Sequence, residues 1–140
     1  MAAKLKFDSA KVGDALPKLV VENLTRPDFV CYAGASGDFV PLHYDQTFVE
    51  MAGIPTVFAQ GMFSAGLLSK CVTDYVGAGQ VRNFKVRFAT RVWPGDTLTC
   101  GGKITNKTEA NGEKIIEGDL EVTNQKGESA IKGSFRAAVA

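Results

Sequence analysis

Hydrophobic residues follow two different spacings along this chain, helical in its first half and alternating in its second half. Residues 18–24 (KLVVENL) predict a short first strand, and residues 84–88 (FKVRF) alternate between apolar and basic side chains, as a strand does. Asn111-Gly112 and Lys126-Gly127 are typical hairpin turns. They separate three further predicted strands, which cover residues 97–105, 113–123 and 129–139.

The segment after the first predicted strand has the residues of a helix start. Thr25 can cap a helix, Pro27 suits the first turn, and Asp28 has the spacing of a capping box and complements the helix dipole. Gly34 and Gly37 are expected to end this helix.

Two more helices are predicted before the strand-rich half begins. A short one runs from Asp45, as its cap, to Gly53. The next, over residues 61–75 (GMFSAGLLSKCVTDY), carries only two charges, Lys70 and Asp74, both late. Because its first nine residues are apolar or small on every side, we expect this helix to be buried on all sides. Only a strongly curved sheet can wrap it in so short a chain, so we expect an α+β fold in which a curved antiparallel sheet wraps a long central helix, the hotdog arrangement.

The composition is that of one globular domain, and we expect residues 1–140 to form it. Lys and Arg number 16 against 15 Asp and Glu, so the net charge of +1 gives no reason to expect nucleic acid or a membrane as partner. The three cysteines are far apart, and no apolar run is long enough for a signal peptide or a membrane span. We therefore expect a cytoplasmic protein without a disulfide framework, a metal site or another cofactor.

The one histidine, His43, lies in a segment between the first two predicted helices, together with Asp38. Gly37 permits a tight turn, and Pro41 restricts both itself and the residue before it, so this segment can hold the two side chains at a constant separation. An imidazole and a carboxylate can manage one water, with one group taking its proton and the other orienting it. The alternative is that Asp38 is an ordinary turn residue and His43 an ordinary loop side chain. A metal site that uses Asp38, His43 and Asp45 is the weakest of these hypotheses.

The start of the long helix, at Gln60-Gly61, is the second candidate site. The first N–H groups of a helix have no intrahelical partner and carry the positive end of the dipole, so a bare N–H at Gly61 can polarise a ligand carbonyl. The alternative is that Gly61 only relieves crowding in a tight core. The apolar residues Phe58, Met62, Phe63 and Leu67 would line an acyl tunnel or belong to the core.

The stretch from Tyr32 to His43 (YAGASGDFVPLH) resembles the hydratase signature of the MaoC-like family, which ends in Gly-Asp-x-Asn-Pro-x-His. That family includes the (R)-specific enoyl-CoA hydratases and the (3R)-hydroxyacyl-ACP dehydratases. The helix start at Gly61 and the turn Pro94-Gly95-Asp96 are similar to the family as well. Two positions depart from the family's pattern: Val40 replaces the usual Asn, and Gln60 replaces the usual His.

The resemblance implies a hydro-lyase that interconverts a (3R)-3-hydroxyacyl thioester and a trans-2-enoyl thioester plus water, without a cofactor. It implies that Asp38 and His43 are catalytic and activate the water. It implies that Gly61, Gln60 and Ser69 are substrate-binding positions, with the Gly61 N–H on the thioester carbonyl and Ser69 supporting the aspartate. The substrate would be an acyl-CoA or an acyl-ACP, and the assembly a homodimer or a heterodimer with a related hotdog chain, with the site at the seam.

Two other functions stay open from the sequence. A hotdog acyl thioesterase would need a carboxylate aimed at the thioester near the helix, whereas Gln60 is an amide. A non-catalytic acyl-binding or stabilising subunit of a heteromeric dehydratase agrees with the changes at Val40 and Gln60, but not with an intact Asp38 and His43.

Overall fold

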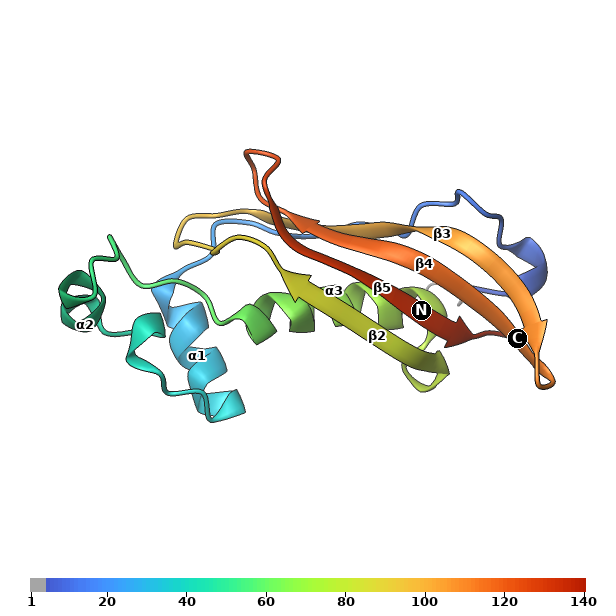
Figure 1. Cartoon of the computed structure of the whole chain (residues 1–140), viewed down its shortest axis with the longest axis horizontal. Helices are drawn as coiled ribbons and strands as arrows, with labels where there is room; N and C mark the ends of the chain where they lie inside the picture. The colour runs from blue at the N-terminus through green and yellow to red at the C-terminus, as the bar shows by residue number, and fades with distance from the viewer. Residues whose placement is uncertain (1–4) are drawn as a thin grey trace.

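The computed structural model describes residues 5–140, and Figure 1 shows their course. The helices are α1 (Arg26–Ser36), α2 (Gln46–Met51) and α3 (Gly61–Val76). The strands are β1 (Leu19–Val21), β2 (Val81–Phe88), β3 (Leu98–Ala110), β4 (Glu113–Thr123) and β5 (Ser129–Ala138), and single turns of 3-10 helix cover Phe7–Ser9, Pro41–His43 and Ala78–Gln80. Within residues 5–140, no helix is both long and apolar enough to cross a membrane.

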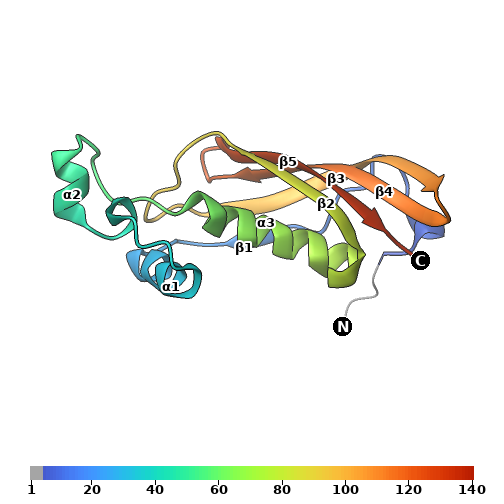
Figure 2. The same ribbon diagram turned by 60° about the horizontal axis from the view of Figure 1, so that its bottom comes forward.

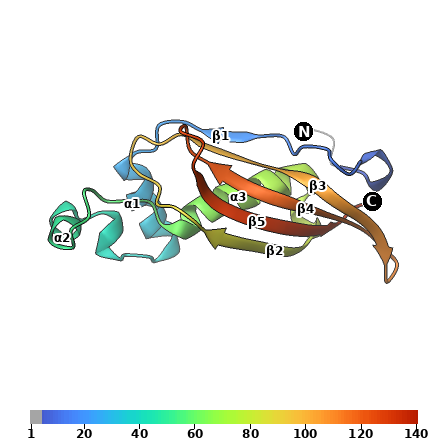
Figure 3. The same cartoon turned by 45° about the horizontal axis from the view of Figure 1, so that its top comes forward.

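The strands form one antiparallel sheet in the order β1-β3-β4-β5-β2, and α3 runs along one face of it (Figures 2 and 3). This arrangement confirms the predicted fold class. The hairpin between β3 and β4 turns at Asn111 and Gly112, whose φ angles of 52° and 76° are the left-handed values that such a turn requires. β4 has the predicted bounds, β3 continues five residues beyond its predicted end, and the first strand is shorter than predicted.

Glycines allow the sheet to bend across α3. Gly102 in β3 and Gly133 in β5 both lie opposite Leu120 of β4, and a Cβ at either glycine would meet the backbone of a neighbouring strand. At Gly118 of β4, a Cβ would run into the ring of Phe135, which covers that glycine from β5. The strands therefore approach one another most closely at these three glycines, where no side chain is in the way.

Only one side of α3 is buried, which corrects the expectation of a helix enclosed on all sides. The side chains that face the sheet are fully buried and join the core, namely Ala65, Leu68, Val72 and Val76. The opposite side carries Gly66, Lys70 and Asp74 in exposed positions, and Met62 is 58% exposed. The five strands of one chain curve over the helix without closing around it.

Both α1 and α2 lie beyond the end of β2 (Figures 1 and 3), in a projecting segment that holds the Asp38 and His43 loop. Arg26 at the start of α1 ties this segment together, because its guanidinium donates to Gln46 at 2.8 Å and to Thr56 at 2.9 Å. Gly34 lies inside α1, so the prediction that it helps to end this helix is wrong; Gly37 ends it.

Candidate active site

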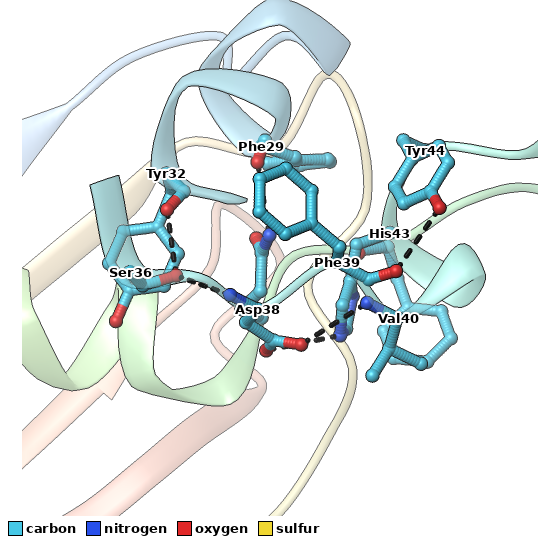
Figure 4. Close-up of polar contacts among 10 residues, drawn as sticks. Phe29, Tyr32, Ser36, Asp38, Phe39, Val40, His43 and Tyr44 are labelled. Atoms are coloured by element: carbon cyan, nitrogen blue, oxygen red, sulfur yellow. Dashed lines mark hydrogen bonds and ion pairs between the residues drawn. The ribbon is translucent and has the colours of Figure 1, made fainter. Parts of the chain in front are cut away.

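Asp38 is positioned by the C-terminal end of α1. Gly37 has a φ of 77°, the left-handed conformation that ends a helix and turns the chain away. The Ser36 hydroxyl donates to the Tyr32 carbonyl at 2.7 Å and accepts the Asp38 N–H at 3.2 Å, as Figure 4 shows. One side chain thereby joins the last turn of the helix to the Asp38 backbone. The Asp38 carboxylate in turn accepts the Val40 N–H at 3.4 Å.

His43 is held in one orientation and is nearly buried, with its side chain 11% exposed. Its Nδ1 lies 2.7 Å from the carbonyl oxygen of Phe58. Because a carbonyl oxygen can only accept, Nδ1 carries the hydrogen, and Nε2 is the proton acceptor of the neutral ring. The Phe58 ring packs edge-on against the imidazole, with the two ring centroids 5.2 Å apart.

The Asp38 and His43 side chains face each other across a gap of 3.8 Å, measured from Oδ2 to Nε2 (Figure 4). This separation exceeds a hydrogen bond but lets one water donate to both atoms, since each such bond is about 2.8 Å long. A water held by both of its hydrogens turns its lone pairs away from the pair, toward a reacting carbon. The Asp38 side chain is 38% exposed, so a substrate can reach this gap.

The start of α3 is joined to α1 through Gln60. Its side chain is 1% exposed, and its Nε2 donates to the carbonyl oxygen of Phe29 at 3.0 Å. Gly61 follows as the first residue of the helix, and a Cβ there would lie 3.0 Å from the ring of Phe88 at the end of β2. A side chain at position 61 would therefore have to displace that ring.

A cavity of about 670 Å³ opens at this helix start, a size typical of small-molecule sites. The helix contributes Gly61 and Ser64, β2 contributes Phe88, and Phe58 and Trp93 supply aromatic surface. Phe58 joins the two parts of the site, since its carbonyl holds His43 and its residue lines the cavity.

Asp38 and His43 do not line this cavity themselves and are linked to it through Phe58, whereas Ser69 joins neither part of the site. Its hydroxyl donates to the Gly66 carbonyl of its own helix at 2.8 Å, and within residues 5–140 no hydrogen bond connects it to Asp38. Of the apolar set, Phe58 lines the cavity, whereas Met62 is exposed and Phe63 packs edge-on against Tyr32 of α1.

The cavity lining also includes one carboxylate, that of Glu128, which accepts the Asn124 side-chain N–H at 2.7 Å. Neither Cys71 nor Cys100 belongs to the lining. Burial raises the pKa of Cys71, and it raises that of Cys100 to about 12, so both remain protonated thiols in the core. Within residues 5–140, no three side chains of His, Cys, Asp or Glu gather closely enough to hold a metal ion.

Two contributors to the site escaped the sequence analysis. The partner of His43 Nδ1 is a backbone carbonyl, and any residue type at position 58 would supply it, so the sequence holds no signal for it. Ser64 lines the cavity from within α3, where a serine between apolar residues looks like an ordinary small core residue.

Comparison with known proteins finds relatives of this chain. A family model described as "MaoC like domain" matches residues 10–126. The peroxisomal hydratase-dehydrogenase-epimerase of Neurospora crassa is 35% identical over 109 residues, which cover 73% of this chain and 12% of that protein. The peroxisomal enoyl-CoA hydratase 2 of Arabidopsis thaliana is 33% identical over 93 residues, which cover 64% of this chain and 30% of that protein. This chain thus spans a small part of the curated relatives it matches. Both of these relatives are named peroxisomal, so the cytoplasmic location expected for this chain stays a prediction.

Solved structures share the fold at lower identity. The unliganded R-hydratase PhaJ1 from Pseudomonas aeruginosa superimposes with a TM-score of 0.86 at 22% identity, covering 97% of this chain and 86% of that one. The (R)-hydratase from A. caviae, described as involved in PHA biosynthesis, gives a TM-score of 0.82 at 23% identity, covering 94% of this chain and 98% of that one. The ChsH1-ChsH2 complex from Mycobacterium tuberculosis gives 0.80 at 22% identity, covering 93% and 98%.

Proposed function

Because this chain belongs to the MaoC-like dehydratase family, we propose that it is a hydro-lyase that interconverts trans-2-enoyl thioesters and (3R)-3-hydroxyacyl thioesters. The observation that carries the proposal is the Asp38 and His43 pair, whose acceptor atoms lie 3.8 Å apart. His43 is held by the carbonyl of Phe58, which precedes the helix start at Gly61 by three residues. Two features support the proposal: an acid–base pair that can activate a water, and a helix start whose free N–H groups can stabilise negative charge on a carbonyl oxygen.

In the hydration direction, the oxygen of the held water bonds to C3 of the enoyl group, and its proton passes to His43 Nε2. The electron pair of the C2–C3 double bond moves toward the thioester carbonyl, whose oxygen gains negative charge beside the Gly61 N–H. The Asp38 carboxylate stabilises the imidazolium that forms. The imidazolium of His43 then gives this proton to C2, which restores the neutral imidazole, and the sum of these steps is one water added. Dehydration runs through the same steps in reverse.

Assembly through β2 is part of the proposal. Within residues 5–140, β2 is an edge of the sheet and pairs only with β5, so its other side offers unpaired backbone groups. A second copy, or a related hotdog chain, would cover that edge by strand pairing. Phe88 at the end of β2 and Met62 in the first turn of α3 are 51% and 58% exposed.

The test is turnover of the purified chain with crotonyl-CoA, followed by loss of the enoyl thioester absorbance and by chiral analysis of the 3-hydroxybutyryl product. We expect the R product and no release of free CoA. Release of the CoA thiol without hydration would instead identify a thioesterase. Binding of crotonyl-CoA without turnover, with hydration only after a related hotdog chain is added, would identify a non-catalytic subunit.

The same assay distinguishes between CoA and an acyl carrier protein as the carrier of the acyl group. Crotonyl-CoA and a crotonyl-acyl carrier protein are compared by kcat/KM, since both present the same reacting group to the site. Arg91 lines the cavity, and its guanidinium lies 5.2 Å from the centroid of the Phe58 ring, so the cavity carries a cation that attracts phosphate groups. CoA has more phosphate groups than the phosphopantetheine arm of a carrier protein. This favours CoA, whose additional phosphates Arg91 attracts, and we expect the higher kcat/KM with crotonyl-CoA.

A further inference from the structure

Two buried polar side-chain atoms have no hydrogen-bond partner within residues 5–140, and both belong to the start of α3. They are Oε1 of Gln60 and Oγ of Ser64, and these two residues are only 1% and 2% exposed. Leaving a buried polar group unpaired lowers the stability of a protein, so native proteins keep few such groups. Both residues line the cavity of about 670 Å³, so a ligand bound there could supply the missing partners.

The two atoms differ in what they can bind. The Gln60 amide is oriented by the bond from its Nε2 to the Phe29 carbonyl, so Oε1 is left as an acceptor only. The Ser64 hydroxyl can donate. Of the two, Ser64 alone can therefore bind a carbonyl oxygen.

Ser64 also lies in the right direction from Gly61. The two residues are three positions apart on α3, so they share one face of the helix. Side chains on a helix lean toward its N-terminus, which brings the Ser64 hydroxyl back toward the end where the Gly61 N–H has no intrahelical partner. The ring of Phe88 covers the Cα side of Gly61 and closes the cavity there.

We propose that Ser64 is a second donor to the thioester carbonyl of the substrate, beside the Gly61 N–H. A carbonyl oxygen has two lone pairs and can accept both bonds, and both strengthen as negative charge develops on that oxygen. The assignment rests on the proposed hydro-lyase function and extends it, because it makes Ser64 a catalytic residue that carries no proton in the reaction.

The first test is the rate of crotonyl-CoA hydration by Ser64→Ala and Ser64→Thr. Loss of one such donor lowers kcat by about 10²- to 10³-fold. We expect that loss for Ser64→Ala with a much smaller change in KM, and recovery of most of the rate in Ser64→Thr, which keeps the hydroxyl. Thr73→Ala on the same helix is the matched control, because that hydroxyl donates to the Lys70 carbonyl of its own helix. It should hydrate at the parent rate.

The second test is independent of turnover. Butyryl-CoA has no double bond to hydrate, and its ¹³C-labelled thioester carbonyl can be followed by infrared spectroscopy when bound. We expect the carbonyl band to shift to lower frequency on binding to the parent protein, and to shift less with Ser64→Ala. The direction of the change in melting temperature also distinguishes the two roles. Ser64→Ala should raise the melting temperature, because it removes an unpaired buried hydroxyl, whereas loss of a hydrogen-bonded structural serine would lower it.

The outcomes separate the two proposals. If crotonyl-CoA is not hydrated but the butyryl-CoA band depends on Ser64, the hydro-lyase function fails and the donor assignment stands. If hydration occurs and Ser64→Ala changes neither the rate nor the band, the donor assignment is overturned. Should Ser64→Ala not fold, Ser64→Cys gives the same decision, because it keeps the shape and replaces the hydroxyl by a weaker donor.

Discussion

The two ring nitrogens of His43 have different roles, because one is hydrogen-bonded within the chain and the other is free to bind a water. Its Nδ1 is held by the Phe58 carbonyl at 2.7 Å, so only Nε2 can exchange a proton with a water. We expect His43→Ala to lower kcat for crotonyl-CoA hydration by about 10²- to 10⁴-fold, the usual effect of losing a general acid–base group. Circular dichroism should show an intact fold. Hydration near the parent rate would contradict the mechanism.

Asp38 is tested by Asp38→Asn, which keeps the shape of the side chain and removes its charge. An amide cannot stabilise an imidazolium, so we expect turnover to fall by at least about 10²-fold. Calorimetric binding of butyryl-CoA should be nearly unchanged.

The matched control for Asp38→Asn is Asp45→Asn, in the same segment. Asp45 caps α2 by accepting the Phe48 N–H at 3.0 Å, and asparagine caps a helix as well as aspartate does. Asp45→Asn should therefore retain full activity. Equal losses in both variants would mean that Asp38 is a turn residue without a role in the reaction.

The acidic and basic residues of the site could be found from the sequence because their spacing depends on local chain geometry. Gly37 and Pro41 restrict the segment between them, and the structure has Asp38 and His43 facing each other as predicted. The role predicted for Ser69 stays a prediction, because within residues 5–140 no hydrogen bond joins it to Asp38. Its distance from Asp38 depends on how α1 packs against α3, which the sequence does not specify.

The capping box at the start of α1 gives the site segment a pH-dependent contribution to its stability. The carboxylate of Asp28 accepts both the hydroxyl and the backbone N–H of Thr25, each at 2.7 Å. Both bonds hold the pKa of Asp28 below its ordinary value, and the bond from the Thr25 hydroxyl has the larger effect. The stabilisation is therefore complete above the unfolded-state pKa of about 4, and is lost as the pH falls through the lower folded-state pKa.

We accordingly expect Asp28→Asn to reduce the free energy of unfolding at pH 7 by less than about 1 kcal/mol, since Asp28 is only half-buried and solvent screens its charge. The difference in the free energy of unfolding between Asp28→Asn and the parent protein should shrink toward zero in strongly acidic solution. Urea unfolding at a series of pH values measures it, with Glu22→Gln, a nearby exposed carboxylate, as the control for general charge effects. A difference that grows on acidification would mean that the Asp28 carboxylate does not stabilise the helix start.

Turns marked by their own residues were predictable, whereas strand ends that depend on a neighbouring strand were not. Asn111 and Gly112 dictate the hairpin by their backbone conformation, and the bounds of β4 followed from it. β3 extends to Ala110 because it pairs with β4 along its whole length, including polar residues that carry no strand signal. The same holds for Val81–Asn83, which belong to β2 through their pairing with β5.

The exposed side of α3 is where the sequence was most misleading about the molecule as a whole. Met62 and Gly66 are apolar or small, which predicted burial, yet in one chain they face outward. A sequence shows that a surface is suited to burial but not whether the same chain or a second one covers it. The uncovered helix face and the open edge of β2 therefore support one explanation, a partner chain.

Strand pairing across β2 predicts which backbone groups a dimer uses. The Ala89 N–H donates to Ala130 at 2.9 Å, toward β5, so by alternation along the strand the Val86 N–H points to the open edge. Proline at position 86 removes that donor without breaking a bond inside the chain, and edge strands tolerate proline on this side. We expect Val86→Pro to sediment as a monomer, whereas Val86→Ala, which loses side-chain packing but keeps the N–H, sediments with the parent as a dimer. Monomeric parent protein, or an equal shift in both variants, would show that the chains do not associate through this edge.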